Sequence, residues 1–526
     1  MKKAIIVLLI LRGAILPAQQ ATTSSFAETI NSNDLYAHEL ILTSDTLEGR
    51  ETGTKGNFKA AEYIASQFEK LGLPKVGKDN SYFQRMVYTN DGWNNIGLTI
   101  NERSFRHQFN FYALPYLNTV VEGGKIEASE VVFLGYGIDD RRYSDYGNKN
   151  VKDKIIMIYP DEPLNKDSIS LITKTKQLSY WSTDIRRKLL RAFQKGVKAV
   201  LIIDSKMAEN IQANRRMFSR NITGDVELPD GKWANSAFIS PDMTKEIIGK
   251  NTEGFTAARE KCATGKPRSL VLPCQLTLKM DKFFKQLIGN NVMGFIEGSD
   301  PVLKDEIVVV TAHYDHLGKR GEQIFHGADD DGSGTSGVLE IAQALNEAKK
   351  QGKGPRRSIL CMLVTGEEKG LLGSKYYVTH PVFPLEKTVA NVNIDMIGRV
   401  DEKYEKAGNP NYIYVIGADK LSQDLHDVNE NMNKTYTKLT LDYTYNDEAD
   451  PNRYYYRSDH YNFAEKGIPA IFFFNGTHDD YHRTTDTIDK INFEKMTKIV
   501  KLAFYTACEI ANRDERLKIT KKAKTP

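Results

Sequence analysis

Three runs of uninterrupted apolar residues in the second half of the chain constrain its fold more than any other feature. They span residues 307–310, 359–364 and 470–474. Strands of this kind are buried on both faces, as in the mostly parallel sheets of α/β proteins. A fourth run, residues 389–394, places Asn391 and Asn393 in alternation with apolar residues, so it predicts a strand with one more polar face.

Helical patterns separate these runs. Apolar residues recur at helical spacing within residues 338–345 and again within 499–511. Near the N-terminus, a polar, turn-rich stretch at residues 44–53 precedes a further helical pattern at 60–71, which Gly72 can close. The sequence therefore predicts an α/β fold with a mixed, mostly parallel central sheet flanked by helices.

Five metal-seeking side chains follow the apolar runs or, in one case, lead straight into a helix. They are His313, Asp330, Glu368, Asp395 and His482. In open α/β sheets the loops beyond the carboxyl ends of the strands converge, so we expect these side chains to lie close together. Two imidazoles and three carboxylates, with no cysteine, suit a pair of hydrolytic zinc ions better than a closed structural zinc site.

The pair Glu367-Glu368 is the most diagnostic local feature. Two adjacent carboxylates at a strand end repel one another unless a cation lies beside one of them and a proton beside the other. A metal ion and its water would meet both needs, with one Glu as ligand and its neighbour as general base. A solvated acidic turn is the alternative for the pair taken alone. Asp315 is a candidate orienting residue for His313, because a metal-bound His usually donates its other ring N–H to a carboxylate.

The order of these motifs resembles a known family. The motifs are His-x-Asp at 313–315, Gly-Ala-Asp-Asp-x-Gly-Ser-Gly at 327–334, Gly-Glu-Glu-x-Gly at 366–370, Asp-Met-Ile-Gly at 395–398 and Tyr-His at 481–482. Together they resemble the co-catalytic di-zinc aminopeptidase family of metallopeptidase clan MH, over roughly residues 285–515. All five ligand positions of that family are filled.

The resemblance implies a role for each residue. One zinc ion would be bound by His313 and Asp395 and the other by Glu368 and His482. Asp330 would bridge the two ions. The resemblance also makes Glu367 the general base and Asp315 the residue that orients His313. In this family the peptide bond after the bridging acid is often cis, here Asp330–Asp331. Asp331 is a departure, because the family often has Asn there, and it adds a carboxylate near the site.

Two further segments are candidates for substrate contact. Residues 457–463 resemble a family segment near the substrate pocket, so Ser458, Asp459 and His460 are candidate contacts of the substrate or the oxyanion. For His460 a structural or supporting role is favoured over a catalytic one. Tyr481, beside the last ligand, is a candidate hydrogen-bond donor to the oxyanion, with packing as the alternative.

The domain organisation follows from changes in the pattern of apolar and charged residues along the chain. We expect a signal peptide at 1–18, an N-terminal part of the catalytic domain at 27–112, an inserted domain at 113–280, the di-zinc peptidase domain at 281–515 and a basic tail at 516–526. Short β-like runs and one amphipathic helix, residues 185–195, make the insertion β-rich. In its position along the chain and in its β-rich sequence pattern, the insertion is similar to the protease-associated domain of larger family members.

The bulk properties narrow the setting. The chain of 526 residues is longer than a single hydrophobic core usually organises, so two or more domains are expected. With 72 Lys+Arg against 68 Asp+Glu and no basic stripe, nucleic acid is not an expected partner. Lys2 and Lys3 precede an apolar segment, which predicts export to the periplasm or the exterior and no membrane span after signal cleavage. In such a compartment Cys262 and Cys274 either pair in a disulfide or stay free.

The resulting hypothesis is an exported aminopeptidase with two Zn²⁺ as cofactors, acting on peptides with a free N-terminus. Alternatives of the same fold are a glutamate-carboxypeptidase-like enzyme, a glutaminyl-cyclase-like enzyme with one zinc, and a non-catalytic receptor-like binding protein. The last two would predict missing ligands, and none is missing. The preferred N-terminal residue, the native metal and the oligomeric state stay open.

Overall fold

The chain divides into two compact units. Unit 1 joins Met1–Val87 to Ile288–Pro526, and unit 2 is Tyr88–Leu287. The computed structural model describes residues 24–213, 221–224 and 233–520. The signal peptide expected at residues 1–18 and the Lys-rich end of the basic tail lie outside these ranges.

Unit 1 is built on a sheet with the strand order β18-β17-β19-β16-β12-β15-β11. The strands are β11 (Leu270–Ile296), β12 (Ile307–His313), β15 (Ser358–Val364), β16 (Thr388–Ile394), β17 (Tyr412–Ile416), β18 (Thr440–Asp442) and β19 (Ala470–Phe474). The four central strands β19, β16, β12 and β15 are parallel, whereas β17 and β11 join their neighbours antiparallel. The predicted mixed, mostly parallel sheet is confirmed.

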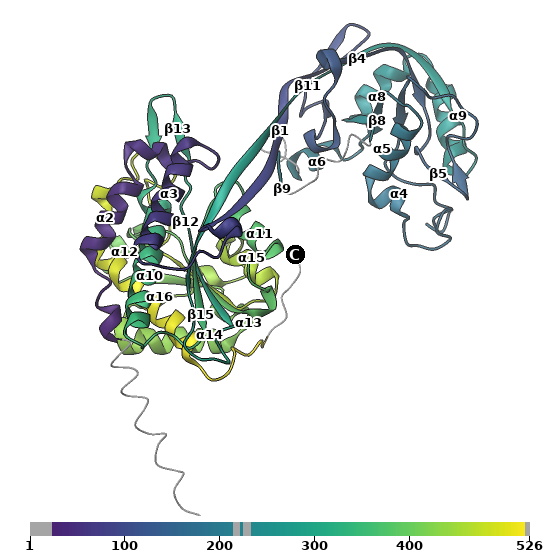
Figure 1. Ribbon diagram of the computed structural model, residues 1–526. Coiled ribbons are helices and arrows are strands. Elements are labelled where there is room, and N and C mark those ends of the chain that lie inside the picture. The colour runs from purple at the N-terminus through teal and green to yellow at the C-terminus, as the bar shows by residue number, and fades with distance from the viewer. Residues whose placement is uncertain (1–23, 214–220, 225–232, 521–526) are drawn as a thin grey trace, which may run out of the picture. The chain divides into compact units, whose positions relative to one another are not determined.

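Helices cover both faces of this sheet (Figure 1). On one side are α2 (Ser32–Leu42), α3 (Lys55–Lys70), α10 (Gly334–Lys350) and α16 (Phe493–Asn512), and on the other α11 (Leu372–Thr379), α13 (Ala418–Leu421) and α15 (His460–Glu465). Alternate residues of β12 enter two cores, because Val308 and Val310 pack toward the first set and Val309 toward the second. An uninterrupted apolar run therefore fits this position.

The polar strand β16 is buried like its neighbours. Asn391 donates from Nδ2 to the Thr311 hydroxyl at 2.9 Å, and Thr311 donates to Asn393 Oδ1 at 2.6 Å. The two asparagines that set this strand apart in the sequence thus bond to the adjacent strand, Asn391 through Nδ2 and Asn393 through Oδ1. This internal polar row leads toward the carboxyl end of the sheet.

The helix expected at residues 60–71 begins earlier, at Lys55. The Thr54 side chain caps it by accepting from the Asn57 N–H at 3.4 Å. Gly72 follows the last turn with φ +74°, a left-handed conformation that glycine adopts without strain. The apolar side of α3, which includes Ile64 and Phe68, is buried in the unit 1 core.

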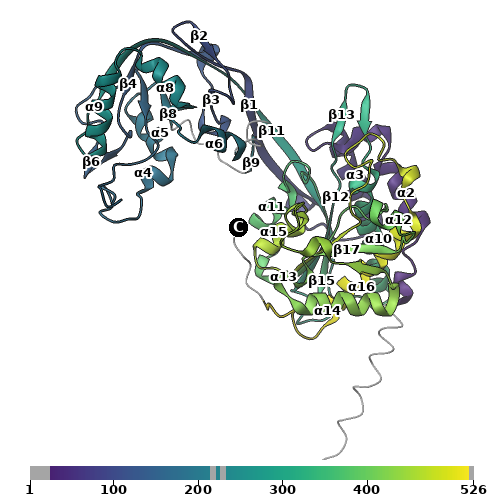
Figure 2. The same ribbon diagram turned by 180° about the vertical axis from the view of Figure 1, so that it is seen from behind.

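Unit 2 has its own α/β core. Four parallel strands, β4 (Lys125–Phe133), β7 (Ile155–Ile158), β8 (Ala199–Ile203) and β10 (Asn235–Ile239), form its centre. Helices α5 (Ile185–Gln194), α8 (Pro241–Ile248) and α9 (Thr252–Ala263) flank them (Figure 2). The amphipathic helix expected at 185–195 is present as α5. The two helices at 241–263 were not expected, so the unit is more helical than a β-rich insertion, and its likeness to a protease-associated domain stays a prediction.

The limits of unit 2 also differ from the expected 113–280. The strand β1 (Phe83–Ile100) has 18 residues and β11 has 27, and both pass from one unit into the other. Each strand continues without interruption across the boundary between the units. The change in sequence pattern at residue 113, on which the expected limit was based, therefore comes well after unit 2 begins at Tyr88. All four cysteines are free thiols, so the open question of a Cys262–Cys274 disulfide is answered in favour of free thiols.

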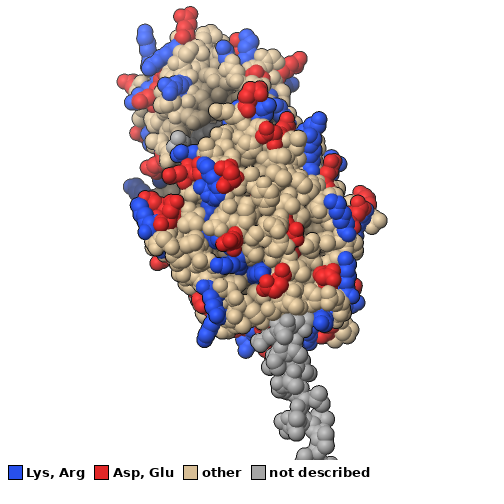
Figure 3. Space-filling view, turned by 90° about the vertical axis from the view of Figure 1, so that its left-hand side faces the viewer, with Lys and Arg blue, Asp and Glu red and all other residues tan. Residues whose placement is uncertain are grey.

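Charges are mixed on the surface seen in Figure 3, where acidic and basic side chains lie interspersed. This agrees with the formal net charge of +4 for the whole chain. Over the residues that the structure describes, no helix combines the length and the apolar character needed to cross a membrane.

Arg50 joins the N-terminal segment to the loops of unit 1. It is fully buried, and its guanidinium donates to the carbonyl oxygens of Leu42, Tyr314, His326 and Gly327. These carbonyls belong to the end of α2, the loop after β12 and the loop before α10. One planar side chain with several fixed donors thus holds three segments together.

Replacing Arg50 by Met should lower the free energy of unfolding of unit 1 by about 3–5 kcal/mol, the usual cost of removing one partner of a buried charged network. All three tryptophans, Trp93, Trp181 and Trp233, lie in unit 2. Denaturant unfolding should therefore shift when followed by far-UV circular dichroism and stay in place when followed by tryptophan fluorescence. The exposed Arg85→Met is the control, and an equal midpoint for both variants would contradict the prediction.

Candidate metal centre

The sequence-predicted ligands lie together at the carboxyl end of the unit 1 sheet. His313 is the last residue of β12, Glu368 follows β15, Asp395 directly follows β16, and His482 lies beyond β19. Asp330 lies in the turn η5 (Ala328–Ser333), immediately before α10. In the register of β12 and β15, His313 is opposite Val364, so the loops after both strands start at the same level.

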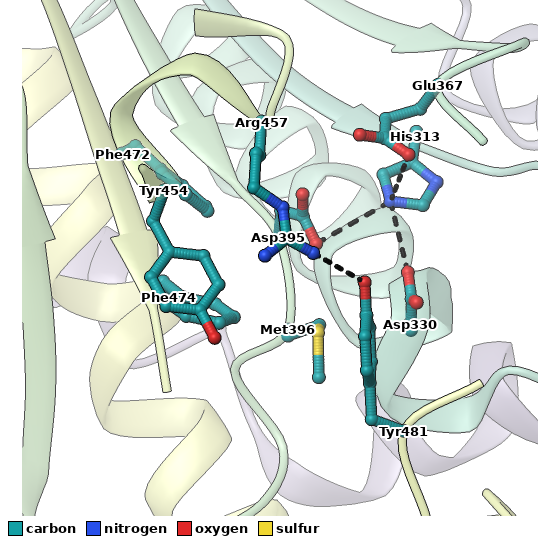
Figure 4. A pocket seen from close by; sticks show the side chains of 10 residues that line it. All are labelled: His313, Asp330, Glu367, Asp395, Met396, Tyr454, Arg457, Phe472, Phe474 and Tyr481. Atoms are coloured by element: carbon teal, nitrogen blue, oxygen red, sulfur yellow. Dashed lines mark hydrogen bonds and ion pairs between the residues drawn. The ribbon is translucent and has the colours of Figure 1, made fainter. Parts of the chain in front are cut away.

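Asp330 lies between the imidazoles of His313 and His482, and Figure 4 shows its contact with His313. His313 Nε2 is 3.3 Å from Asp330 Oδ1 and 3.5 Å from Asp395 Oδ1. His482 Nε2 is 3.0 Å from Asp330 Oδ2 and 3.2 Å from Glu368 Oε1. Each oxygen of Asp330 therefore faces a different imidazole, as in a bridging carboxylate. The peptide bond Asp330–Asp331 is cis, as the resemblance implied.

Asp315 supports this arrangement in a different way from the one expected. The Nδ1 atom of His313 is 3.0 Å from the main-chain oxygen of Asp315 and 3.8 Å from its carboxylate. The carboxylate instead accepts from the Thr52 hydroxyl at 2.8 Å and from the Glu367 N–H at 3.2 Å. Its side chain thus positions Glu367, and its backbone orients His313.

Asp331 is also buried at the centre, within ligand distance of His313 and Asp395. Its two oxygens, however, accept from the main-chain N–H groups of Gly334 at 2.8 Å, Met396 at 3.1 Å and His313 at 3.2 Å. Burial raises the pKa of this carboxyl well above its usual range. Asp331 therefore ties three segments together through main-chain hydrogen bonds.

Among the three candidates in residues 457–463, Ser458 is the one that contacts a predicted ligand. Its hydroxyl donates to Asp395 Oδ2 at 2.6 Å and accepts from Asn393 Nδ2 at 2.8 Å. The polar row of β16 thus continues through Ser458 to Asp395. Because Oδ2 is occupied in this way, Oδ1 is the oxygen that faces His313.

Asp459 and His460 do not point at the ligands in the same way. Asp459 is fully buried, accepts from the Ser374 hydroxyl, and has its pKa raised to about 7 by burial. His460 is buried against Phe472, with ring centroids 4.8 Å apart, and burial lowers its pKa to about 3. A neutral, packed ring agrees with the structural role favoured for His460.

The adjacent carboxyls Glu367 and Glu368 differ sharply in acidity. Burial raises the pKa of Glu367 well above its usual range, and the negative charges of Glu368 and Asp395 act in the same direction. Burial also acts to raise the pKa of Glu368, but the imidazoles of His316 and His482 outweigh it and bring the value to about 2. Two neighbouring carboxyls whose surroundings push their pKa values apart are typical of an acid–base site.

The carboxylates form one wall of an open pocket with about 340 Å³ of empty space (Figure 4). The other wall is apolar and aromatic, and consists of Met396, Tyr454, Phe472 and Phe474. Tyr481 stacks on the ring of His482, with centroids 3.9 Å apart, and Arg457 Nη2 donates to its hydroxyl at 3.3 Å. Burial and the nearby carboxylates raise the pKa of Tyr481, so this hydroxyl keeps its proton.

One residue of the centre was missed in the sequence. His316 is fully buried, and its Nδ1 lies 3.0 Å from Glu368 Oε1. The signal was present, because His316 is the second histidine of Ala-His-Tyr-Asp-His. It was overlooked because the motif comparison assigns only the first histidine a role.

The donor set fits metal ions. Imidazole nitrogens and carboxylate oxygens 3.0–3.5 Å apart have the spacing of neighbouring ligands around one ion, which is about 3.3 Å for tetrahedral bonds of about 2.0 Å. Carboxylates buried this close together need positive charge between them.

Comparison with known proteins identifies the family. Residues 291–507 match the model of peptidase family M28. The chain is 30% identical over 297 residues to leucine aminopeptidase 1 of Sclerotinia sclerotiorum, which covers 51% of this chain and 72% of that protein. The chain belongs to peptidase family M28. The resemblance inferred from the motifs is thereby confirmed, and the M28 segment contains every predicted ligand.

The chain is also similar to two other proteins. The M28 chain is 30% identical over 292 residues to aminopeptidase YwaD of Bacillus subtilis, and the match spans 54% of this chain and 58% of that one. Among solved structures, an aminopeptidase from Aneurinibacillus sp. strain AM-1 is 19% identical with a TM-score of 0.49, over 95% of this chain and 98% of that chain.

Replacing Ser458 by Ala should weaken Zn²⁺ binding by about 10–100-fold, the usual effect of losing a group that orients a metal ligand. Without the hydroxyl, Asp395 can turn away from His313. Competition with a chromophoric chelator measures the change. Ser236→Ala is a matched control, because that buried hydroxyl in unit 2 has no hydrogen-bond partner among the described residues. Equal affinities in Ser458→Ala and Ser236→Ala would refute the orienting role.

Proposed function

We propose that this M28 protein is an exported zinc aminopeptidase that removes N-terminal residues from peptides. The observation that carries the proposal is Asp330, whose two oxygens face His313 on one side and His482 on the other, beside a pocket that also contains Glu367. Aminopeptidase is also the name of the relatives to which the chain is similar. Export rests on the N-terminal sequence alone.

The residues for metal binding follow from these contacts. His313 and Asp395 would hold one Zn²⁺, Glu368 and His482 the other, and Asp330 both. When bound, the ions would polarise the scissile carbonyl and lower the pKa of a water molecule to about 7. Mixed imidazole and carboxylate donors without cysteine are suited to zinc in hydrolytic sites.

Glu367 is proposed to move the proton. Its carboxylate would accept a proton from the attacking water and deliver it to the nitrogen of the leaving amine. Its Oε2 atom lies 4.0 Å from His313 Nε2, so it borders the centre without being the nearest carboxylate to that ring. The raised pKa of Glu367, which burial causes, brings its proton affinity nearer to that required at neutral pH.

Tyr481 is proposed to stabilise the developing negative charge. Its protonated hydroxyl lies in the pocket and can donate to the carbonyl oxygen as that oxygen becomes an oxyanion. Stacking on His482 and the contact from Arg457 hold the ring in place. A donor fixed in advance needs no reorganisation during the reaction.

The pocket walls suggest the substrate. The carboxylate wall favours a positively charged α-amino group, and the wall of Met396, Tyr454, Phe472 and Phe474 favours an apolar first side chain. An N-terminal residue such as leucine has this combination.

A carboxypeptidase is the second candidate, because the exposed Arg457 guanidinium at the pocket can bind a terminal carboxylate. Dipeptides with a free or an amidated C-terminus separate the two functions. An aminopeptidase of this design cleaves both forms, whereas a carboxypeptidase cleaves only the free acid.

The first test is hydrolysis of aminoacyl anilides and their N-acetylated forms by the mature protein, with the zinc content counted. We expect release from the free amines only, fastest with leucine. Glu367→Gln should lower kcat by about 10²–10⁴-fold, because it removes the proton carrier, and should leave the zinc content unchanged. The exposed Glu386→Gln is the control. Cleavage of the acetylated substrates would exclude an aminopeptidase.

The role of Tyr481 is tested separately. Tyr481→Phe should lower kcat by about 10²–10³-fold, the usual effect of losing one oxyanion donor, with little change in KM. Tyr456→Phe serves as the control, because Tyr456 is 37% exposed and does not line the pocket. A change confined to KM would make Tyr481 a packing residue instead.

A further inference from the structure

His316 is a buried imidazole that the proposed function leaves without a task. It lies in the loop after β12, three residues beyond His313, and its side chain is 0% exposed. Gly327 packs against the ring so closely that a Cβ atom there would come within 2.4 Å of it. The ring is therefore held in one place, against the carboxylates of the centre.

The contacts of this ring are unusual for a buried histidine. Its Nδ1 atom lies 3.0 Å from Glu368 Oε1 and 3.8 Å from Asp330 Oδ2. Neither approach has the alignment of a hydrogen bond, and Nε2 has no hydrogen-bond partner within the described part of the chain. Burying a polar group without a partner is costly, so such groups usually have a ligand or an ion beside them.

Four donor atoms converge on this side of the centre. They are His316 Nδ1, His482 Nε2, Glu368 Oε1 and Asp330 Oδ2, and the separations recorded among them are 3.0, 3.0, 3.2 and 3.8 Å. A nitrogen and oxygen set at these separations matches four ligands around one ion. On the other side, Asp330 Oδ1 and Asp395 Oδ1 approach His313 Nε2 at 3.3 and 3.5 Å, whereas the nearby Asp331 carboxylate accepts from main-chain N–H groups.

We propose that His316 is a further protein ligand, through Nδ1, of the zinc ion held by Glu368 and His482. The proposal rests on the metal binding of the proposed function, and it makes the two positions unequal. The Glu368 side has four protein ligands, as closed sites do, whereas the His313 side has three and keeps a place for water or substrate.

A simpler role for His316 is an ion pair, in which a protonated ring faces Glu368. The two roles differ in what a metal does to the ring. A ligand loses its proton and binds zinc directly, whereas an ion pair is displaced when zinc takes its place. Counting the imidazoles around zinc therefore separates them.

The test uses Zn²⁺ itself and compares the wild-type protein with His316→Ala and His316→Asn. Competition with a chromophoric chelator gives the affinity of each position, and X-ray absorption counts the imidazoles. In the wild type we expect three imidazoles shared by two zinc ions. In His316→Ala we expect two, with the affinity of the tighter position reduced by more than the roughly 10–100-fold caused by losing an outer partner.

Two controls make the outcome decisive. His326→Ala changes a histidine of the loop before α10, which bonds Asp45 at 2.9 Å, and it should bind zinc like the wild type. His316→Asn keeps a metal-binding oxygen, Oδ1, near the position of Nδ1, and it should recover part of the zinc affinity lost in His316→Ala. Circular dichroism of the metal-free proteins checks that the variants fold.

Each result bears on one conclusion. Wild-type affinity and an unchanged imidazole count in His316→Ala would overturn the assignment of His316. A wild type that binds two zinc ions with three imidazoles but hydrolyses no aminoacyl anilide would support His316 as a ligand and exclude the aminopeptidase. A wild type that binds no zinc would overturn both.

Discussion

The carboxylates around Asp330 impose the constraint on which the centre depends. Asp395 lies 3.5 Å from the His313 ring, Glu368 lies 3.2 Å from the His482 ring, and Asp330 lies within 3.3 Å of both. Like charges at such distances cannot all be ionised unless positive charge lies among them. Backbone N–H groups meet this need for Asp331, and Thr52 with the Glu367 N–H meets it for Asp315. The oxygens of Asp330, Asp395 and Glu368 face the imidazoles of His313, His482 and His316, and a divalent cation among these groups would supply the positive charge.

The sheet of unit 1 also orients one of the predicted ligands, Asp395. The polar row on β16 begins inside the sheet at Thr311 and Asn393 and continues through Ser458 to Asp395. Every residue of this row makes a hydrogen bond, so burying the row costs little folding free energy. The row also fixes the orientation of Asp395. The asparagines that made this strand look less apolar are therefore connected to the centre. A similar connection runs from the N-terminal segment, where Arg50 holds the loop that contains Gly327.

Much of unit 1 could be predicted because its signals are local. Uninterrupted apolar runs predict buried strands, and residues that directly follow such strands converge at one edge of the sheet. His316 could not be found in this way, because only the folded loop shows that its ring faces Glu368 rather than solvent. The helix α9 was missed because its apolar residues have weak helical periodicity, and α8 was missed because its 8 residues are too few for a helical pattern to stand out. The limits of unit 2 were missed because β1 and β11 are continuous across them.

The unequal donor sets on the two sides of Asp330 indicate different roles for the two proposed metal positions. A position surrounded by four protein donors has little freedom to exchange a ligand, so its main effect is a fixed positive charge and a fixed Asp330. A position with three protein donors is the one that can accept water and substrate. In this chain that position, at His313 and Asp395, also borders Glu367 and the aromatic wall of the pocket. The proposed proton carrier Glu367, the apolar pocket and the position proposed to accept water therefore lie on the same side. The residues on the other side, His316 among them, would act on the reaction through Asp330.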